Sequence, residues 1–417
     1  MHVVMLSDLE TQGGAAIGAS RLAEGLIKAG ARVTRLVGYP DGQTHPWTTQ
    51  LLGGLLRRRF VWKLMQGISK RLSLQLAMLT QEVWVKWLLH RILRRLNPDV
   101  IIVHNLHLAG WWPDLISACA HHAPAIWALH DMWSFTGRCA YSYDCRKFIS
   151  GCDASCPTPD EYPALAPKLI SGAWELRRHL LAEHLDLVAV CPSYWLAKEA
   201  LTGLWKGHRV EVIPYGLALE TYRPIDRNLA RAALGIDTVG PVLLVSAQSM
   251  QERRKGMSIL VEALRRVSHR PLTLITMGRG SLPINSEDIY LHSLGYIDHE
   301  RTKVLVYNAA DVLVHPAPVD NLPFVVLEAI ACGTPVIGFP IGGLLDLARP
   351  GQTGWLADAV TPEALAATID IAIRDLHVGT DLRSFCLAIA QSEYSSELQT
   401  RRYLELMRSL GVSGSAD

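Results

Sequence analysis

Residues 312–343 read VLVHPAPVDNLPFVVLEAIACGTPVIGFPIGG, and this stretch decides the fold. A short apolar run at 312–315 leads into a loop, a helical pattern at 322–332 and a second apolar run at 336–339. Short apolar runs bounded by turn residues are typical of strands buried on both faces, and strands that alternate with helices form parallel sheets. The stretch therefore predicts one strand–helix–strand unit of an open α/β sheet.

The same alternation continues on both sides of this stretch. Helical patterns lie at 256–267 and 300–310, and three more follow at 362–376, 380–391 and 395–410. This repetition predicts an α/β protein with doubly wound parallel sheets. Further strands are predicted at 2–7, 31–37, 100–104, 125–129, 187–191, 210–214, 242–246 and 272–277.

The chain has 417 residues, which favours two domains, because single hydrophobic cores stop growing at about 250–300 residues. The alternation relaxes into a polar stretch at 217–240, which we predict to be a linker. It separates an N-terminal Rossmann-like domain at 1–216 from a C-terminal one at 241–395. Residues 396–417 are predicted to form a helix that packs back on the N-terminal domain. Two such domains are expected to face each other across a cleft, with ligands at the carboxyl ends of the strands.

Composition excludes several classes of function. Lys plus Arg (41) nearly balances Asp plus Glu (39), so the bulk charge gives no reason to expect a nucleic acid as partner. The first residues lack the pattern of a secretory signal, and no apolar run is long enough to span a membrane. We therefore expect a cytoplasmic protein with reduced thiols.

Two loops have the features of anion sites. Gly13 and Gly14 follow the first strand where a helix begins, so the backbone can approach a ligand closely and offer free N–H groups. The alternative is a tight turn that needs glycine for its backbone angles. Arg253, Arg254 and Lys255 stand just before another helix, where three cations oppose the helix dipole unless an anion is present. The alternative there is a solvated basic loop.

Two carboxylates stand out in the opening stretch. Asp320 is placed to cap the following helix, with Pro323 in its first turn. Glu328 lies further along the helix among apolar neighbours, where a carboxylate needs a partner. Sugar hydroxyl groups are suitable partners. The alternative is a bare cap at Asp320 and a core ion pair at Glu328.

Asp320, seven intervening residues and Glu328, followed by AIACGTPVI at 329–337, resemble the signature of the retaining glycosyltransferases of family 4, which adopt the GT-B fold. The stretch at 130–157, HDMWSFTGRCAYSYDCRKFISGCDASCP, is similar to the branch that builds exopolysaccharides and polymers of the colanic acid type. The resemblance covers nearly the whole chain, including Gly13-Gly14, His130-Asp131, IPYG at 213–216, RKG at 254–256, LGYI at 294–297 and GG at 342–343.

This resemblance implies roles for individual residues. Lys255 and Arg254 would neutralise the diphosphate of a nucleotide-sugar donor, and Glu328 would accept from the ribose hydroxyl groups. Asp320 and His130 would act on the transferred sugar as the catalytic pair. The remaining donor-side residues would be Gly13, Gly14, Asn321, Leu322, Pro323 and Phe324, and His104, Asn105 and His107 would face the acceptor.

The chain is accordingly predicted to be a retaining hexosyltransferase that moves a sugar from a nucleoside diphosphate to a saccharide acceptor, lipid-linked by the resemblance, in polysaccharide biosynthesis. No cofactor is expected for the chemistry. Two alternatives remain: a sugar-nucleotide epimerase or phosphorylase of the same fold, and a non-catalytic sugar-binding partner of an assembly complex.

Four of the eight cysteines lie within 137–157. The segment has little to build a core of its own, and four thiolates can order such a loop around a structural zinc ion. The spacings of five, six and three residues are not those of a paired C-x-x-C ribbon, so unpaired thiols, disulfides and an iron–sulfur cluster remain alternatives. The predicted ligands are Cys139, Cys145, Cys152 and Cys156.

Residues 57–95 contain ten Lys or Arg residues and one acidic residue, interleaved with aromatic side chains. A basic helical region of this kind can lie on an anionic membrane, so we predict peripheral contact with the inner face of the membrane. The alternative is the solvated face of core helices.

Overall fold

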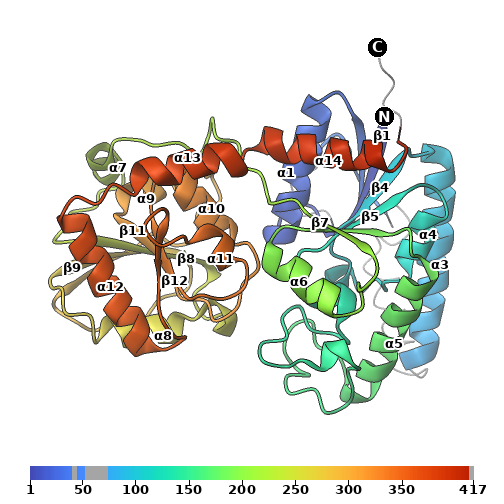
Figure 1. Cartoon of the computed structure of the whole chain (residues 1–417), viewed down its shortest axis with the longest axis horizontal. Coiled ribbons are helices and arrows are strands. Elements are labelled where there is room, and N and C mark those ends of the chain that lie inside the picture. Colours follow the sequence, from blue (N-terminus) through green and yellow to red (C-terminus); the bar gives the residue numbers. More distant parts are fainter. Residues whose placement is uncertain (40–44, 52–73, 413–417) are drawn as a thin grey trace, which may run out of the picture. The chain divides into compact units, whose positions relative to one another are not determined.

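The computed structural model describes residues 1–39, 45–51 and 74–412, and it describes side chains of the 74–96 helix from residue 83 onward. The chain divides into two compact units (Figure 1). Unit 1 contains Met1–Pro192, Leu196–Ile213 and Thr400–Asp417, and unit 2 contains Ser193–Trp195 and Pro214–Gln399.

Unit 1 is built on a parallel sheet in the order β3-β2-β1-β4-β5-β6-β7. Its central strands are continuous runs of buried apolar residues, as expected for a sheet covered on both faces. The strands are β1 (His2–Leu9), β2 (Arg32–Tyr39), β3 (Thr48–Gln50), β4 (Val100–Val103), β5 (Ala125–Ala128), β6 (Val188–Cys191) and β7 (Arg209–Val212).

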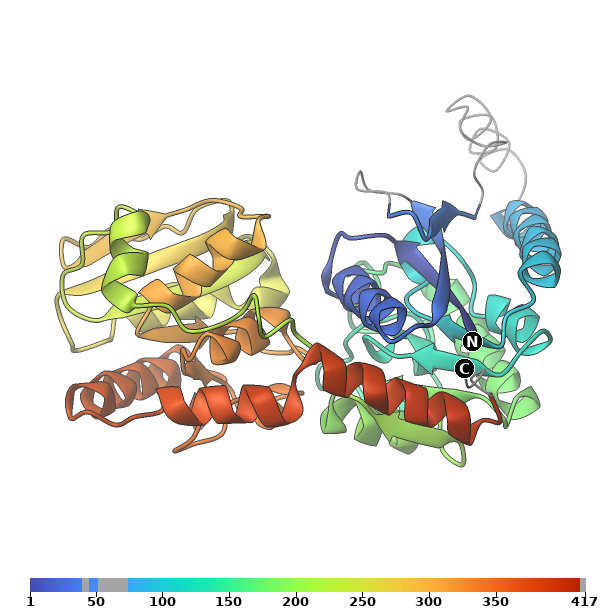
Figure 2. The ribbon, with the colours of Figure 1, turned by 90° about the horizontal axis from the view of Figure 1, so that it is seen from above.

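The helices of unit 1 cover this sheet. On one face, α1 and the C-terminal helix α14 share a core with β1, β2, β4, β5 and β6, to which α14 contributes Tyr403, Leu406 and Met407. Figure 2 shows α14 in red passing along unit 1. The helices are α1 (Gly14–Lys28), α3 (Leu74–Leu96), α4 (Leu115–Ala120), α5 (Pro167–Glu183), α6 (Tyr194–Thr202) and α14 (Ser396–Ser409), with short 3₁₀ turns η1 (His107–Ala109), η2 (Met132–Phe135) and η3 (Lys147–Ile149).

Unit 2 is built on a second parallel sheet, in the order β10-β9-β8-β11-β12-β13. One core joins the sheet to α9, α10 and α13, and the other joins it to α8 and α12. The strands are β8 (Val242–Ser249), β9 (Leu272–Arg279), β10 (Ile289–Ser293), β11 (Val312–His315), β12 (Val336–Gly338) and β13 (Gly354–Leu356).

The helices of unit 2 are α7 (Arg227–Ala233), α8 (Met257–Leu264), α9 (Glu300–Ala309), α10 (Phe324–Ala331), α11 (Leu344–Leu347), α12 (Pro362–His377) and α13 (Arg383–Glu393), with the 3₁₀ turn η4 (Arg253–Lys255). The stretch at 217–240, predicted as a linker, lies within unit 2 and contains α7, because Asp226 caps that helix through a hydrogen bond from the Leu229 N–H. Among the described residues, no helix is both long and apolar enough to cross a membrane.

The predicted α/β class and its two doubly wound parallel sheets are confirmed. In each unit, the carboxyl ends of the central strands lead into loops that carry the predicted site residues: β1, β4 and β5 in unit 1, and β8 and β11 in unit 2.

Candidate functional site

In unit 2, three charged side chains from two loops meet at the carboxyl edge of the sheet. Lys255 and Arg254 follow β8 in η4, and Asp320 follows β11. Lys255 Nζ lies 2.7 Å from Asp320 Oδ2, and Arg254 Nη1 lies 3.1 Å from Asp320 Oδ1. The predicted cations and the predicted catalytic carboxylate are therefore in direct contact.

The Asp320 carboxylate is ionised. Its burial opposes ionisation, but Lys255 and Arg254 outweigh that cost and hold the pKa of Asp320 well below its ordinary value. His315, at the end of β11, also lies close, with Nε2 3.3 Å from Asp320 Oδ2, and burial lowers the pKa of this histidine. The carboxylate thus supplies negative charge to two of the cations before α8, and Arg254 also pairs with Glu252 at 2.8 Å.

Two glycines allow these loops to approach one another. Gly256 has φ +69°, and a Cβ atom there would lie 1.8 Å from the carbonyl oxygen of Pro316 in the loop after β11. Gly342 has φ +55°, and a Cβ atom there would lie 2.0 Å from the carbonyl oxygen of Asp320. Only glycine fits at either position, so the RKG and GG motifs are required by close packing against the Asp320 loop.

The predicted helix cap is wrong. Helix α10 begins at Phe324 with Pro323 at the N-cap position, and Asp320 instead accepts a hydrogen bond from its neighbour's N–H, that of Asn321, at 3.0 Å. The physical reason is that the Asp320 carboxylate is held by Lys255 and Arg254. Asn321 and Leu322 are buried beside it, and the Phe324 ring stacks on Tyr215 at 4.5 Å.

Glu328 is buried in the middle of α10, as the sequence predicts for a carboxylate with a partner. A hydrogen bond from the hydroxyl group of Tyr307, on α9, reaches Glu328 Oε2 at 2.8 Å. Burial, together with this carboxylate, raises the pKa of Tyr307 well above its ordinary range, so the phenol remains a proton donor. Tyr307 is a site residue that the sequence analysis did not identify, because it lies 21 residues away on another helix.

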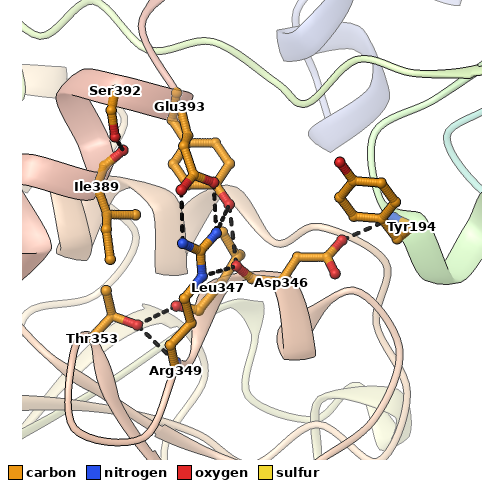
Figure 3. A network of polar contacts seen from close by, with 9 residues as sticks. Tyr194, Asp346, Leu347, Arg349, Thr353, Ile389, Ser392 and Glu393 are labelled. Carbon is orange, nitrogen blue, oxygen red and sulfur yellow. Dashed lines mark hydrogen bonds and ion pairs between the residues drawn. The ribbon is translucent and has the colours of Figure 1, made fainter.

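The loop that contains Gly342 and Gly343 leads into α11, which an arginine ties to the end of α13 (Figure 3). Arg349 forms a two-pronged ion pair with Glu393 at 2.7 and 2.6 Å, and its Nε donates to the carbonyl oxygen of Asp346 at 3.0 Å. Such pairing fixes direction as well as distance. The position of α11 is thereby anchored to a second helix of unit 2.

In unit 1, Gly13 and Gly14 form the turn between β1 and α1. Gly13 has φ +89°, a conformation that favours glycine, and Gly14 is the first residue of the 15-residue helix. No side chain caps the N-terminus of α1, so its first N–H groups lack that partner. This geometry fits the predicted close approach of the backbone to an anionic group.

His130 and His104 lie together at the ends of β5 and β4. His104 Nδ1 and His130 Nε2 are 2.9 Å apart, and both side chains are buried. Burial lowers the pKa of His104 well below its ordinary value and that of His130 to about 4, although Asp131 acts to raise the latter. Both imidazole groups are therefore neutral at physiological pH and share one hydrogen bond.

His107 and Asn105 contact the same carboxylate, that of Asp131. His107 Nε2 lies 3.0 Å from Asp131 Oδ2, and Asn105 Nδ2 donates to that oxygen at 3.3 Å. Asp8, from β1, lies near this pair and accepts a hydrogen bond from the Leu108 N–H at 3.2 Å. Two of the three residues predicted to face the acceptor, Asn105 and His107, thus lie against Asp131, while the third, His104, pairs with His130.

Asp8 was missed by the sequence analysis, although its position at the end of the first strand is a signal that could have found it. Burial raises the pKa of Asp8. For the other carboxylate, burial opposes ionisation but His107 outweighs it, so the pKa of Asp131 is lowered.

The four cysteines of the insertion do not form a metal site among the described residues. All four are free thiols, and no group of three or more His, Cys, Asp or Glu side chains in the described part of the chain is arranged to hold a metal ion. The sulfur of Cys152 accepts a hydrogen bond from the Gly137 N–H at 3.2 Å, and Cys139 is buried. The zinc site stays a prediction from the sequence.

The insertion has packing of its own, contrary to expectation. Arg138 is buried and donates to the carbonyl oxygens of Glu161 and Pro163, at 2.5 and 3.0 Å, and to Thr158 Oγ1 at 2.8 Å. The rings of Phe135 and Phe148 pack edge to face at 5.6 Å. One buried guanidinium group and an aromatic pair therefore contribute packing to this loop.

Comparisons with known proteins identify a family for the chain. A model described as "Glycosyltransferase Family 4" matches residues 12–221, and one described as "Glycosyl transferases group 1" matches residues 240–375. A putative colanic acid biosynthesis glycosyl transferase, WcaC of Escherichia coli, is 31% identical over 260 residues, which cover 59% of this chain and 61% of the relative. The D-inositol 3-phosphate glycosyltransferase of Mycolicibacterium gilvum is 30% identical over 39% of this chain and 38% of its own. The matches thus span about three fifths or less of these relatives.

Solved structures resemble nearly the whole chain. A sucrose-phosphate synthase from Thermosynechococcus elongatus has a TM-score of 0.71 at 21% identity, with 99% of this chain and 100% of that chain covered. The Anabaena protein HepE, in complex with UDP-glucose, has a TM-score of 0.65 at 16% identity, with 98% and 100% covered. At these identities the likeness shows the fold alone.

Proposed function

Because the chain belongs to glycosyltransferase family 4 and has the GT-B fold, we propose that it is a retaining hexosyltransferase that uses a nucleoside diphosphate sugar. The acceptor is a saccharide, lipid-linked in our proposal, and the product is part of a polysaccharide. The similarity to a colanic acid biosynthesis protein supports the polysaccharide assignment.

The contact of Lys255 and Arg254 with buried Asp320 carries this proposal. When a nucleoside diphosphate leaves the anomeric carbon, negative charge grows on the phosphate and positive charge grows on the sugar ring. Two fixed cations beside one buried carboxylate can stabilise both charges, if the diphosphate takes over the cations and the carboxylate faces the sugar. Such charge separation in a site that excludes water is a major source of catalysis.

Glu328 completes the donor side in this proposal. Its carboxylate accepts a hydrogen bond from the Tyr307 hydroxyl group and would accept further hydrogen bonds from the ribose. The backbone from Asn321 to Phe324 lies between Asp320 and Glu328 in the sequence and would line the sugar. His130, neutral and buried in unit 1, would contact the transferred sugar as a hydrogen-bonding group.

The outer helix α3 supports contact with a membrane. Trp84 and Trp87 are 64% and 49% exposed, and the Arg91 guanidinium lies 4.8 Å from the Trp87 ring centroid. Val85, Leu89 and Leu93 face the core, so the aromatic residues lie on the opposite side. An exposed aromatic and basic face suits an anionic lipid surface. Of the predicted region at 57–95, residues 57–73 lie outside the described residues.

The proposal is tested by a thermal-shift screen of the purified chain against UDP-, GDP-, ADP- and dTDP-sugars. UDP-glucose comes first, since HepE was captured with it. We expect one nucleotide class to raise the unfolding temperature, and Lys255→Ala and Glu328→Ala to abolish that rise. Arg265→Ala is the matched control, because this arginine is 69% exposed on unit 2 and its partner is Glu262.

The alternatives give other outcomes. An epimerase or phosphorylase would convert the donor without an acceptor sugar or would require free phosphate. A non-catalytic partner would bind sugar with no functional consequence of Asp320→Ala. A folded protein that responds to none of the donors would contradict the proposed transferase.

A further inference from the structure

A group of arginines lines a pocket of unit 2 that does not contain Asp320. Arg227 and Arg231 come from α7, and Arg383 is the first residue of α13. The pocket has a volume of about 730 Å³ and opens to solvent. Among the described residues that line it, Asp226 is the one acidic residue. The pocket therefore combines three cations with one carboxylate.

The pocket lies at the amino edge of the unit 2 sheet. Asp311, which comes directly before β11, accepts hydrogen bonds from Arg227 Nη1 at 2.6 Å and from Arg231 Nη2 at 3.0 Å. Its other oxygen accepts a hydrogen bond from the N–H of Val242, the first residue of β8, at 2.8 Å. Because the Asp320 site follows the carboxyl ends of these same parallel strands, the two sites lie at opposite edges of the sheet.

The carboxylates near the pocket do not balance its arginines. Asp311 is shared between two guanidinium groups, and Asp226 caps the N-terminus of α7. A third aspartate, Asp381, lies near Arg383, but it is exposed to water and accepts hydrogen bonds from Ser384. Water and salt screen an exposed charge of this kind, so the pocket keeps an excess of positive charge.

Arg383 forms no ion pair with any carboxylate in the described part of the chain. Its hydrogen bonds there all come from Nη2, which donates to the carbonyl oxygen of Ile225 at 3.2 Å and to Asn308 Oδ1 at 3.4 Å. Burial, followed by the positive charge of nearby Arg227, lowers the pKa of Arg383. The two guanidinium groups therefore repel each other, and an anion bound between them would remove that repulsion.

Arg227 also has a donor without a partner. Its Nε is buried and makes no hydrogen bond to any of the described residues, although its Nη1 binds Asp311. A buried donor without a partner costs free energy, which a ligand with acceptor oxygens would recover. Guanidinium groups form paired, charge-assisted hydrogen bonds with the oxygens of phosphate.

We propose that this pocket binds a phosphate group, either free or carried as a monoester, through Arg227 and Arg383. A phosphate dianion brings two negative charges and at least three acceptor oxygens, which suit two guanidinium groups better than a carboxylate does. The volume of the pocket leaves room for a small organic group joined to the phosphate. This binding site does not depend on the proposed transferase function.

The test is isothermal titration calorimetry of the full chain with inorganic phosphate, against chloride at matched ionic strength. We expect saturable binding by the parent chain and by Lys255→Ala, which lacks a cation of the Asp320 site. Arg383→Gln and Arg227→Gln should each weaken binding about 10-fold or more, because each loses a charge-assisted hydrogen bond. Arg265→Gln is the matched control and should bind as the parent does, since this arginine is exposed outside the pocket.

A further variant guards against a folding defect, because Arg383→Gln also loses the hydrogen bond to Ile225. Arg383→Lys keeps the positive charge but loses the planar fork, so we expect it to bind phosphate more tightly than Arg383→Gln and more weakly than the parent. The thermal unfolding transition of each variant shows whether it is folded. If Arg383→Gln does not fold, Arg383→Lys and Arg227→Gln decide the outcome.

The outcomes separate this site from the donor site. Phosphate binding that is lost in Lys255→Ala and kept in Arg383→Gln would place the anion at the Asp320 site and overturn the proposal. Absence of phosphate binding, or equal binding of acetate, would also overturn it. Glycerol 3-phosphate distinguishes the two sources of the phosphate group: tighter binding than inorganic phosphate supports a monoester, and equal binding supports free phosphate. A failed donor screen would overturn the transferase function and leave this test unaffected.

Discussion

The two units hold their site carboxylates with different kinds of partner. Asp320 in unit 2 is paired with a lysine and an arginine, which keep their charge across the physiological pH range. Asp131 in unit 1 is paired with a histidine, whose charge changes within that range. The charges on the unit 2 pairing therefore stay constant across this pH range, whereas the charge on the unit 1 pairing changes with pH.

The largest expected effect follows from removal of the fixed charge in unit 2. Asp320→Asn leaves Lys255 and Arg254 without their buried counter-charge, so we expect turnover to fall about 10²–10³-fold and the free energy of unfolding to fall by about 3 kcal/mol. Steady-state kinetics and urea unfolding measure the two quantities.

The folded Asp320 pKa lies far below the unfolded value of 3.8. Its contribution to stability is therefore complete above that value and is lost only as pH falls through the folded pKa. The stability difference between the parent chain and Asp320→Asn should stay constant from pH 6 to pH 9. A stability difference that changes across this pH interval would contradict a constant charge at the Asp320 pairing of unit 2.

The two units also hold their loops in different ways. Unit 2 uses close contacts at glycines and the ion pair of Arg349, whereas the cysteine-rich insertion of unit 1 at 137–157 is held by Arg138. Arg138→Ala leaves three acceptors in and around the insertion without their donor, so we expect the free energy of unfolding to fall by about 2 kcal/mol. Exposed Arg146→Ala, in the same insertion, is the control and should cost less.

Metal analysis and a chelator decide the zinc prediction in the same experiment. About one zinc per chain, together with a fall in unfolding temperature on chelation, would support the four-thiolate site. Metal-free protein with an unchanged transition would leave Arg138 and the aromatic pair as the support of the insertion.

A smaller effect is expected from the titratable pair. His107 has a raised folded pKa, so its stabilisation is complete below 6.5 and is lost as pH rises through the folded value. Asp131 has a lowered pKa, so its stabilisation is lost only in acid. We expect the stability difference between the parent chain and His107→Gln to shrink between pH 6 and pH 9, as measured by urea unfolding at each pH. A stability difference that stays constant from pH 6 to pH 9 would mean that the unit 1 pairing is as insensitive to pH as the unit 2 pairing.

The smallest expected effect concerns the outer helices. In α3, residues 83–96 contain Lys86, Arg91, Arg94 and Arg95 and no acidic residue, whereas α12 of unit 2 contains Glu363, Asp370 and Asp375. We expect the double variant Trp84→Ser, Trp87→Ser to bind vesicles of anionic phospholipid about 10-fold more weakly, because it loses interfacial aromatic area. Flotation measures this, with neutral vesicles and the α12 variant Ile371→Ser as controls. Equal binding of parent and double variant would remove α3 from the membrane proposal.

The central strands were predictable because short apolar runs, such as 100–103 and 312–315, indicate strands that are buried on both faces. The edge strands β3, β10 and β13 were missed, since Thr48–Gln50 and Ile289–Ser293 are short or largely exposed and their pattern resembles loop. The seven-residue helix in the polar stretch at 217–240 was also missed, because it is short and only Ala230 of it is buried.

The candidate site was predictable as a set of residues but not as a set of contacts. Lys255 and Asp320 were both identified, but no local pattern indicated that they pair across 65 positions, and the cap assigned to Asp320 was wrong for that reason. Tyr307 was missed because its role arises from a partner on a different helix. Local patterns report burial and turns, while pairings between loops are determined by the tertiary fold.

The path of α14 has a consequence for synthesis of the chain. Tyr403, Leu406 and Met407 fill the core of unit 1, although about 190 residues of unit 2 are made between them and the rest of that unit. On the ribosome, unit 2 can therefore complete its core before unit 1 can. Until α14 is synthesised, the apolar surface on the α1 face of the first sheet stays exposed. A chaperone that shields this face during translation would act on residues 1–213 and release them once α14 emerges.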